Sequence, residues 1–246
     1  MEQPIISVKD VSMMFNLNRD KVMSMKEYVV KALQRKLFYD EFWALKNISF
    51  DVMRGEILGL VGLNGAGKST LLKLISGVFK PTHGSIAVNG SVVPLLELGT
   101  GFDFEFSAKE NVYMNGAMFG HPPAYMDTIY NDIMDFAELW EFENVPLKNF
   151  SSGMQARLGF AVATSVEPDI LILDEVLSVG DFRFMEKCEA RVSELLSGGA
   201  TVLIVSHNPE AIKNMCSRAL LLKKGELISI GTVDEVCRVY QDEAAS

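Results

Sequence analysis

Hydrophobic residues recur along this chain with two different periods, and each period predicts a different kind of secondary-structure element. Alternation with a period of two runs through residues 5–12 and again through 44–52, which predicts half-buried strands. Three short apolar runs without alternation predict strands that are buried on both faces. These runs cover Ile57–Val61, residues 170–173 and Thr201–Val205.

A period of three to four residues predicts helices in three places. It begins at Lys68 and ends at Ile75, and it returns over residues 108–118 and 124–139. The last two stretches have little strand propensity, so we expect a separate helical lobe over about residues 100–165. Residues 85–90 end in an Asn-Gly pair, which predicts a hairpin strand and a β-rich lobe beside the core.

An insertion over residues 19–41 combines helical spacing with a basic excess. It predicts an amphipathic helix, because apolar residues recur at steps of three and four while most lysines and arginines lie between them. Such a helix suits a negatively charged membrane surface, at roughly 1 kcal/mol per basic residue. The alternative, a solvated face on a core-packed helix, stays open. The apolar positions are Val22, Met25, Val29, Leu33 and Leu37, and Phe38, Tyr39, Phe42 and Trp43 form an aromatic cluster at the exit.

Composition narrows the class of protein. The chain has 246 residues, 48% of them hydrophobic, which is enough for one large domain or two small ones with a well-filled core. No linker is long enough to divide independent domains, so we expect one domain over 1–246. Its net charge of −9 argues against a general nucleic-acid binder. Three cysteines without a metal-ligand spacing predict neither disulfides nor a zinc site. No signal peptide or membrane-spanning run is present, so we expect a cytoplasmic chain with peripheral membrane contact.

The candidate chemistry starts between the predicted strand that ends at Val61 and the helix that starts at Lys68. Residues 62–69 read G-x-x-x-x-G-K-S, the pattern of a P-loop, in which backbone N–H groups and the positive end of a helix cradle phosphates. Lys68 is expected to reach the terminal phosphates and Ser69 to ligate Mg²⁺. The predicted ATP-binding residues of this loop are Gly62, Asn64, Gly65, Gly67, Lys68, Ser69 and Thr70.

Phe15 follows the first predicted strand at the edge of a polar turn. The sequence supports two interpretations of this ring equally well. An aromatic ring at this point could stack on an adenine, or it could close the rim of a sheet, where aromatic residues are common.

Polar residues follow two of the buried runs. Asp174 and Glu175 end the second run, and Ser206-His207 follows the third. Because the carboxyl ends of parallel strands meet at one edge of a sheet, we expect them beside the P-loop. In phosphoryl transfer the carboxylate of Asp174 would hold Mg²⁺ and Glu175 would accept the proton of the attacking water. The predicted catalytic residues are therefore Glu175, together with His207 at the same sheet edge and Lys68 of the P-loop.

Residues 150–154, Phe-Ser-Ser-Gly-Met, followed by Arg157, resemble the signature motif of the ABC ATPases. With both phosphate-site motifs, a D-loop at 178–181 and His207 as the switch histidine, the resemblance covers nearly the whole chain. It implies an α/β P-loop NTPase of the ABC ATPase type, with an antiparallel β lobe, a RecA-like core and a helical lobe, using ATP and Mg²⁺. It also implies a head-to-tail homodimer in which ATP on Lys68 of one copy is covered by Ser151 and Gly153 of the other.

The sequence departs from the common family pattern at three positions. Ser152 replaces the usual glycine and Met154 the usual glutamine of the signature. Glu97 stands where the family has a glutamine that contacts Mg²⁺ and water, so it is the third predicted metal contact besides Ser69 and Asp174.

With these departures, the basic insertion and residues 95–102, the chain resembles the nucleotide-binding subunits of bacterial cell-surface polysaccharide exporters of the O-antigen, teichoic acid and capsule types. The resemblance implies a homodimeric integral membrane permease, a lipid-linked polysaccharide substrate and a place on the cytoplasmic side of the bacterial inner (plasma) membrane. Translation factors with tandem cassettes and repair proteins with a long coiled coil fit less well. An ATP-dependent regulatory or structural switch that transports nothing is the alternative function.

Overall fold

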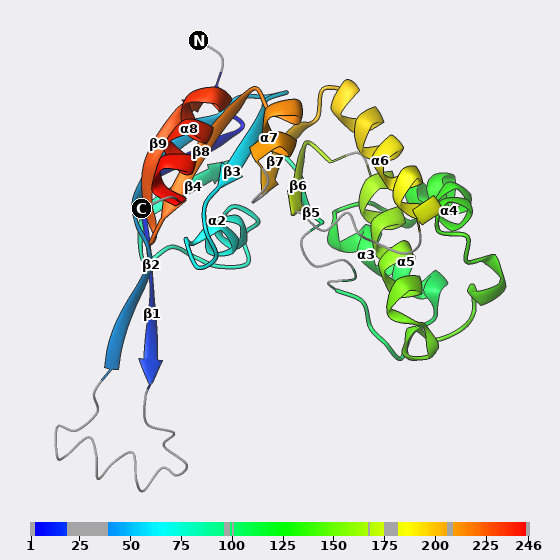
Figure 1. The fold of residues 1–246 in the computed structure, drawn as a ribbon. Coiled ribbons are helices and arrows are strands. Elements are labelled where there is room, and N and C mark those ends of the chain that lie inside the picture. Colours follow the sequence, from blue (N-terminus) through cyan, green and yellow to red (C-terminus); the bar gives the residue numbers. More distant parts are fainter. Residues whose placement is uncertain are drawn as a thin grey trace, which may run out of the picture.

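The structure is a computed structural model, and it describes residues 3–18, 39–95, 99, 101–166, 168–174, 182–205 and 209–244. The predicted basic helix of the insertion lies outside the described residues, apart from 39–41, which belong to a strand. Figure 1 shows a β-rich part, on which both termini lie, and a helical part beside it.

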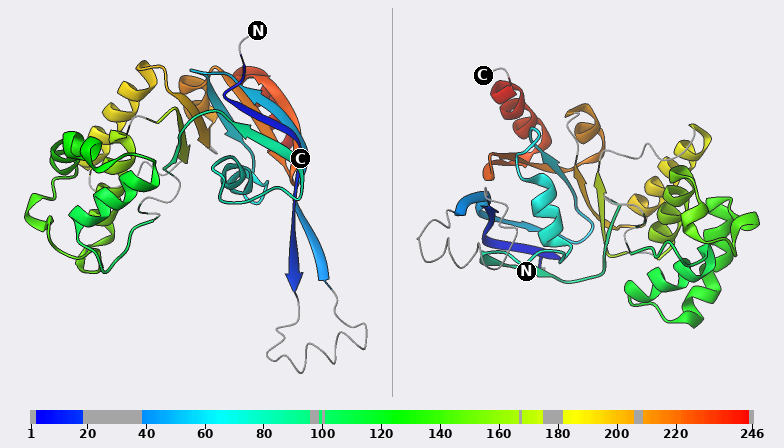
Figure 2. Two further views of the ribbon diagram at one scale, coloured as in Figure 1. Left: turned by 180° about the vertical axis from the view of Figure 1, so that it is seen from behind. Right: turned by 90° about the horizontal axis from the view of Figure 1, so that it is seen from below.

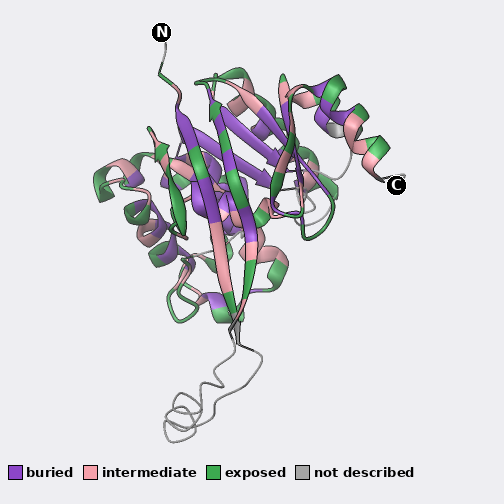
Figure 3. Ribbon diagram, turned by 90° about the vertical axis from the view of Figure 1, so that its left-hand side faces the viewer, coloured by how far each residue is buried: buried purple, intermediate pink, exposed green. Residues whose placement is uncertain are grey.

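A three-stranded antiparallel sheet has the order β2-β1-β4, with β1 at Ile6–Asn18, β2 at Tyr39–Val52 and β4 at His83–Val88. β1 pairs with β2 along its whole length, but with β4 only as far as Ser12. The far ends of β1 and β2 therefore project as a two-stranded ribbon, whose described part is less buried than the rest of the two strands (Figure 3). Phe15 lies within β1 rather than at a turn, because the strand continues beyond the alternating segment.

The predicted hairpin at 85–90 is wrong. β4 pairs with β1, whereas the next strand, β5 (Val92–Pro94), runs parallel to β6 in the other sheet. The Asn-Gly pair therefore marks a crossing between two sheets. Asn89 N donates to Ile5 O at 2.8 Å on one side of the crossing, and Ser91 O accepts from Ile170 N at 3.0 Å on the other.

The second sheet has six strands in the order β5-β6-β7-β3-β8-β9, and only β9 is antiparallel to its neighbour. The predicted buried strands are confirmed here, since continuous apolar runs suit strands that are covered on both faces. The three confirmed strands are β3 at Ile57–Val61, β6 at Ile170–Asp174 and β7 at Thr201–Val205. The sheet is completed by β8 at Arg218–Lys223 and β9 at Glu226–Thr232.

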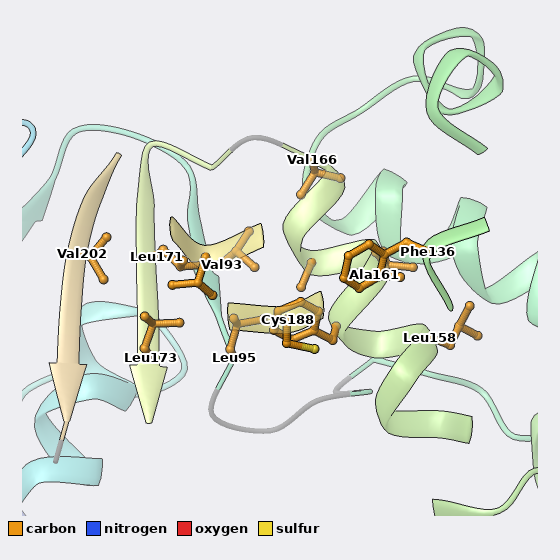
Figure 4. Packing of buried hydrophobic residues seen from close by; sticks show 14 of the residues in the cluster. Val93, Leu95, Phe136, Leu158, Ala161, Val166, Leu171, Leu173, Cys188 and Val202 are labelled. Atoms are coloured by element: carbon orange, nitrogen blue, oxygen red, sulfur yellow. The ribbon is translucent and has the colours of Figure 1, made fainter. Parts of the chain in front are cut away.

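Each central strand sends alternate side chains into two different hydrophobic clusters. Leu58, Ile172 and Leu203 join the cluster that lies against the three-stranded sheet and α2 (Lys68–Ile75). Leu171 and Val202 face the other way and join the cluster that continues into the helices (Figure 4). The central sheet is thus the layer on which both lobes are built.

The helical lobe consists of α3 (Ala108–Met118), α4 (Pro123–Ala137) and α5 (Ser152–Ser165), and α6 (Phe182–Ser197) packs beside them (Figure 2). Short 3₁₀ turns at Trp140–Phe142 and Leu147–Asn149 lie between α4 and α5. α7 (Pro209–Met215) and α8 (Val233–Ala244) pack on the central sheet. Among the described residues, no helix is both long and apolar enough to span a bilayer.

Candidate functional site

Three neighbouring strands of the central sheet end at one level. Leu60 in β3 and Asp174 in β6 both pair with Val205 in β7. The P-loop leaves this edge directly after β3, and Asp174 is the last residue of β6. Glu175 and His207 follow β6 and β7 in the sequence but lie outside the described residues, as does Glu97, so their predicted roles stay predictions.

The path of the P-loop is fixed by backbone contacts that leave no room for side chains. A Cβ added at Gly62 would lie 2.4 Å from Leu222 O, and one added at Gly67 would lie 2.7 Å from Ala44 O. Gly67 also has φ +106°, in the region that favours glycine. These two glycines let the loop pack against β8 and β2.

Two further residues brace the loop from behind. Gly225, in the turn between β8 and β9, donates its N–H to Ala66 O at 2.9 Å and accepts from Lys46 N at 2.7 Å. Local sequence patterns could not reveal this brace, because it joins three segments that lie far apart in the chain. The loop is therefore held between two sheets before any ligand is considered.

Lys68 is the first residue of α2, and its ammonium turns back over the loop. Its Nζ donates to Gly62 O at 2.5 Å and to Leu63 O at 3.2 Å. Gly67 occupies the N-cap and has no side chain, so it makes no side-chain hydrogen bond to the N–H groups at the positive end of the helix. Asn64, Gly65 and Ser69 are exposed, and Thr70 is half-buried. The arrangement suits an anion, with a cation and helix N–H groups on the same side.

The signature residues begin another helix. Ser151 is the N-cap of α5, where its Oγ accepts from Met154 N at 3.2 Å. Gly153 is open, since an added Cβ would meet only Ser151 Oγ, at 3.9 Å. This helix start belongs to the helical lobe and the P-loop to the sheet lobe, so the predicted contacts to ATP come from different lobes (Figure 1).

Phe15 pairs across the strands with Phe42, and its ring meets that of Phe79 edge-on, with 5.8 Å between centroids. This contact fits the interpretation of a rim aromatic. The ring is only partly buried, and stacking on adenine stays a prediction.

One cavity beside the P-loop was not foreseen. Its volume is about 150 Å³, and it is lined by Leu63, Asn64 and Gly65, three exposed residues of the P-loop, and by Tyr240 and Glu243 of α8. α8 is joined there to β8 by an ion pair between Lys223 and Glu243. No sequence signal links α8 to the P-loop, because its residues match no motif.

The described residues contain no cluster of His, Cys, Asp and Glu that could hold a metal by itself. Burial raises the pKa of the Cys188 and Cys216 thiols to about 12, so both stay protonated near neutral pH and neither thiol is nucleophilic.

The chain matches the ABC transporter family over residues 45–178. Among curated relatives, it is 43% identical over 240 residues to the ABC transporter protein AbcA of Aeromonas salmonicida, covering 98% of this chain and 77% of that protein. It is 39% identical over 245 residues to the O-antigen export system ATP-binding protein RfbB of Klebsiella pneumoniae, covering 99% and 100%. The teichoic acids export ATP-binding protein TagH of Listeria monocytogenes is 37% identical over 237 residues, covering 96% and 70%.

A dimeric, post-hydrolysis structure of the ATP-binding cassette MJ0796 bound to ADP and Pi has a TM-score of 0.71 to this chain. Its identity is 21%, with 93% of this chain and 98% of that chain covered, so the likeness concerns the fold. The predicted fold class is confirmed.

The chain therefore belongs to the ABC transporter family, as an ATP-binding subunit with ATPase activity. The resemblance to the nucleotide-binding subunits of polysaccharide exporters is confirmed as well, since two of the relatives carry such names.

Proposed function

We propose that this chain hydrolyses ATP to power the export of a lipid-linked cell-surface polysaccharide through a separate membrane permease. The observation that carries the proposal is the end-to-end similarity to RfbB, an O-antigen export system ATP-binding protein. The braced P-loop supports the ATPase half of the proposal, because it offers an anion site at the strand edge where two predicted catalytic residues follow in the sequence.

The residues present fit Mg²⁺, which would neutralise charge on the phosphates during transfer. The hydroxyl of Ser69 and the carboxylate of Asp174 supply the hard oxygen ligands that Mg²⁺ prefers, with Glu97 as a third contact. Lys68 binds the terminal phosphates, and Glu175 accepts the proton of the attacking water. His207 is the third catalytic residue, beside Lys68 and Glu175.

The composite site needs two copies of the chain. Ser151 and Gly153 lie at the start of α5, which reaches the surface of the helical lobe, and a second copy in head-to-tail orientation would bring that helix end to the ATP on Lys68. The dimeric state of the MJ0796 structure supports this arrangement. ATP then closes the pair, and hydrolysis reopens it to drive the permease.

Mixing two inactive variants tests the shared site. Lys68→Ala removes the phosphate contact and Ser151→Arg blocks the signature, so a mixed dimer retains one intact composite site. We expect ATP-driven dimerisation and partial ATP hydrolysis in the mixture, measured by light scattering and phosphate release, and neither in the separate variants. A mixture as inactive as its components would contradict the shared site.

The export half is tested in the cell. A deletion strain should accumulate lipid-linked saccharide, detected by mass spectrometry, and the tagged chain should copurify with a permease homodimer. Copurification without any accumulated saccharide would instead indicate the regulatory switch that transports nothing.

We place the complex on the cytoplasmic side of the bacterial inner membrane, with the insertion 19–41 at the lipid interface. Replacing Lys26, Lys31, Arg35 and Lys36 by glutamine should remove on the order of a few kcal/mol of attraction to anionic liposomes at low salt. ATP binding should persist, and export should fall. The matched control replaces four exposed basic residues of the sheet lobe by glutamine, namely Lys9, Lys46, Arg54 and Lys80. Equal liposome binding by both sets would contradict the placement.

A further inference from the structure

Helices α4, α5 and α6 meet at three phenylalanines, one from each helix. Phe136 of α4 lies 5.8 Å from Phe160 of α5 and 5.6 Å from Phe184 of α6, measured between ring centroids. Phe160 and Phe184 are 6.4 Å apart. All three rings are buried, and Figure 4 shows Phe136 beside α5 in the hydrophobic cluster that continues from the central sheet.

Cations from α5 and α6 cover these rings. The guanidinium of Arg157 lies 4.8 Å from the ring of Phe184, so a residue of α5 contacts a residue of α6. The ammonium of Lys187 lies 4.8 Å from the ring of Phe136, so a residue of α6 contacts a residue of α4. Each contact links two helices.

Glu138 connects these cations. It directly follows α4, and its carboxylate accepts from Arg157 at 3.3 Å and from Lys187 at 3.1 Å. Lys187 also donates to Phe136 O at 2.9 Å, at the negative end of α4. One carboxylate thus joins the end of α4 to α5 and α6, through one cation from each of these two helices.

The backbone at Glu138 is unusual for this residue type. Its φ is +60°, in the left-handed region that commonly ends a helix and that glycine adopts without strain. Glutamate at this position keeps the strain, and its side chain is 58% exposed, so the ion pairs themselves stabilise the fold little. Strain that is kept without a matching gain in stability points to a role in function.

The position of the junction suggests that role. α5 begins with the signature residues Ser151 and Gly153, and α6 begins directly after residues 175–181, which include Glu175. The junction therefore connects the helix that would cover the ATP of a second copy with the helix that follows this chain's own catalytic carboxylate.

We infer that Glu138 is a positioning residue, which clamps α5 to α6 and thereby sets where the signature lies relative to the chain's own nucleotide half-site. The inference rests on the proposed composite dimer. The arrangement makes ATP-dependent closure sensitive to a side chain that touches neither nucleotide nor metal.

Glu138→Gly tests the clamp, because glycine adopts the left-handed backbone without strain and removes the side chain that carries the carboxylate. Glu105→Gln is the control, since Glu105 forms an exposed ion pair with Lys148 at 2.5 Å and both residues lie outside α5 and α6. The unfolding midpoint of both variants should stay within about 2 °C of that of the parent chain. Binding of a fluorescent ATP analogue by the single copy should change by less than about twofold.

The first readout needs no dimer. Spin labels at Ser152→Cys and Glu189→Cys, two exposed positions on α5 and α6, report the distance between these helices without nucleotide, in a chain carrying Cys216→Ala. The distribution should be narrow in the parent chain and in Glu105→Gln, and clearly broader in Glu138→Gly. An unchanged, narrow distribution in Glu138→Gly would overturn the inference.

The second readout is ATP-driven dimerisation in a Glu175→Gln background, measured by light scattering, together with turnover in the native background. Glu138→Gly should raise the dimer dissociation constant roughly tenfold, equivalent to about 1.4 kcal/mol, and lower kcat while leaving KM within about twofold. A broad distance distribution with parental dimerisation would overturn the positioning role. Absence of dimerisation in the parent chain would refute the proposed composite site, and the clamp would then be judged by the spin-label distance alone.

Discussion

The P-loop and the start of α5 are the two halves from which we expect a composite site, and they are held in different ways. At Gly62 and Gly67 the backbone approaches carbonyl oxygens so closely that an added Cβ would lie 2.4 and 2.7 Å from them. At Gly153 an added Cβ would meet only Ser151 Oγ, at 3.9 Å. The phosphate half is locked by backbone packing, whereas the signature half presents an open helix end.

The contacts that hold the two halves in place also differ, since the P-loop is held by backbone groups and the start of α5 by side chains. The P-loop rests on Gly225, whose N–H donates to Ala66 O and whose carbonyl accepts from Lys46 N, so that the loop is joined to both sheets. α5 is tied to its neighbours by side chains, including Arg157 and the carboxylate of Glu138. Backbone packing permits one arrangement, while side-chain contacts permit small shifts of a helix. The difference suits a fixed nucleotide site that a second, adjustable surface closes.

The largest expected effect comes from adding one methyl group to the locked half. Gly67→Ala would place Cβ 2.7 Å from Ala44 O at φ +106°, so the loop must move. We expect ATP affinity to fall more than about 100-fold and the free energy of unfolding to fall by roughly 2–4 kcal/mol. Calorimetric titration and chemical denaturation measure the two quantities.

Gly65→Ala is the control for this comparison. Its added Cβ would have no neighbour within 4 Å, although φ is +77°. The free energy of unfolding should fall by only about 1–2 kcal/mol, from backbone strain alone. Equal destabilisation by both variants would mean that strain, rather than packing against Ala44, locks the loop.

The same substitution in the open half should have the opposite effect on stability. Gly153→Ala adds a better helix former to the first turn of α5, where space is available, and should raise the free energy of unfolding by about 0.5–1 kcal/mol. ATP binding by a single copy should not change. Turnover should fall roughly tenfold or more, because the new methyl group would occupy the surface that approaches the phosphate. Parental turnover would show that the helix end does not cover ATP.

The fold could be read from the sequence where the pattern was local. The buried strands β3 and β7 and the helix α2 have the predicted bounds, because apolar runs and helical spacing lie within single segments. The pairing of β4 with β1 was not predictable from the Asn-Gly pair, since turn chemistry does not choose a strand's partner. The length of β1 beyond Ser12 was missed because three consecutive apolar residues, 13–15, interrupt the alternation.

The candidate site shows the same division. The P-loop and signature residues could be identified because their motifs are contiguous. The brace at Gly225, the cavity beside Tyr240 and the clamp at Glu138 depend on contacts between distant segments, and the residue types at these positions carry no signal by themselves.

The smallest expected effect concerns acid stability, and it compares the two lobes directly. In the sheet lobe, the hydrogen bond from Arg54, followed by the backbone N–H of Ser91, lowers the pKa of Asp169. In the helical lobe, hydrogen bonds from Tyr130 and Lys109 lower the pKa of Glu143. Both carboxylates therefore favour the folded state only while they are ionised.

The sign follows from linkage. A carboxyl group whose pKa is lower in the folded chain stabilises it at pH values above the unfolded pKa, about 3.9 for Asp and 4.3 for Glu, and that stabilisation is lost as pH falls through the folded pKa. Asp169→Asn should therefore lower the free energy of unfolding at pH 7 by no more than about 1 kcal/mol, because the Asp169 side chain is 39% exposed and solvent screens the pair. The difference from the parent chain should shrink steadily below pH 4.

Glu143→Gln should show the same pH dependence, and the two variants together test whether the lobes unfold as one unit. Asp169 directly precedes β6 and pairs with Arg54, while Glu143 lies between α4 and α5. The hydrophobic cluster that runs from Leu171 to Phe160 joins these regions, so both losses should appear in one cooperative transition. Urea unfolding between pH 3 and 7, followed by tryptophan fluorescence, which reports Trp43 in the sheet lobe and Trp140 in the helical lobe, and by far-UV circular dichroism, measures this. Two separate transitions, each shifted by only one of the substitutions, would show that the helical lobe unfolds independently. The contrast between the locked P-loop and the adjustable start of α5 would then extend to the stability of the two whole lobes.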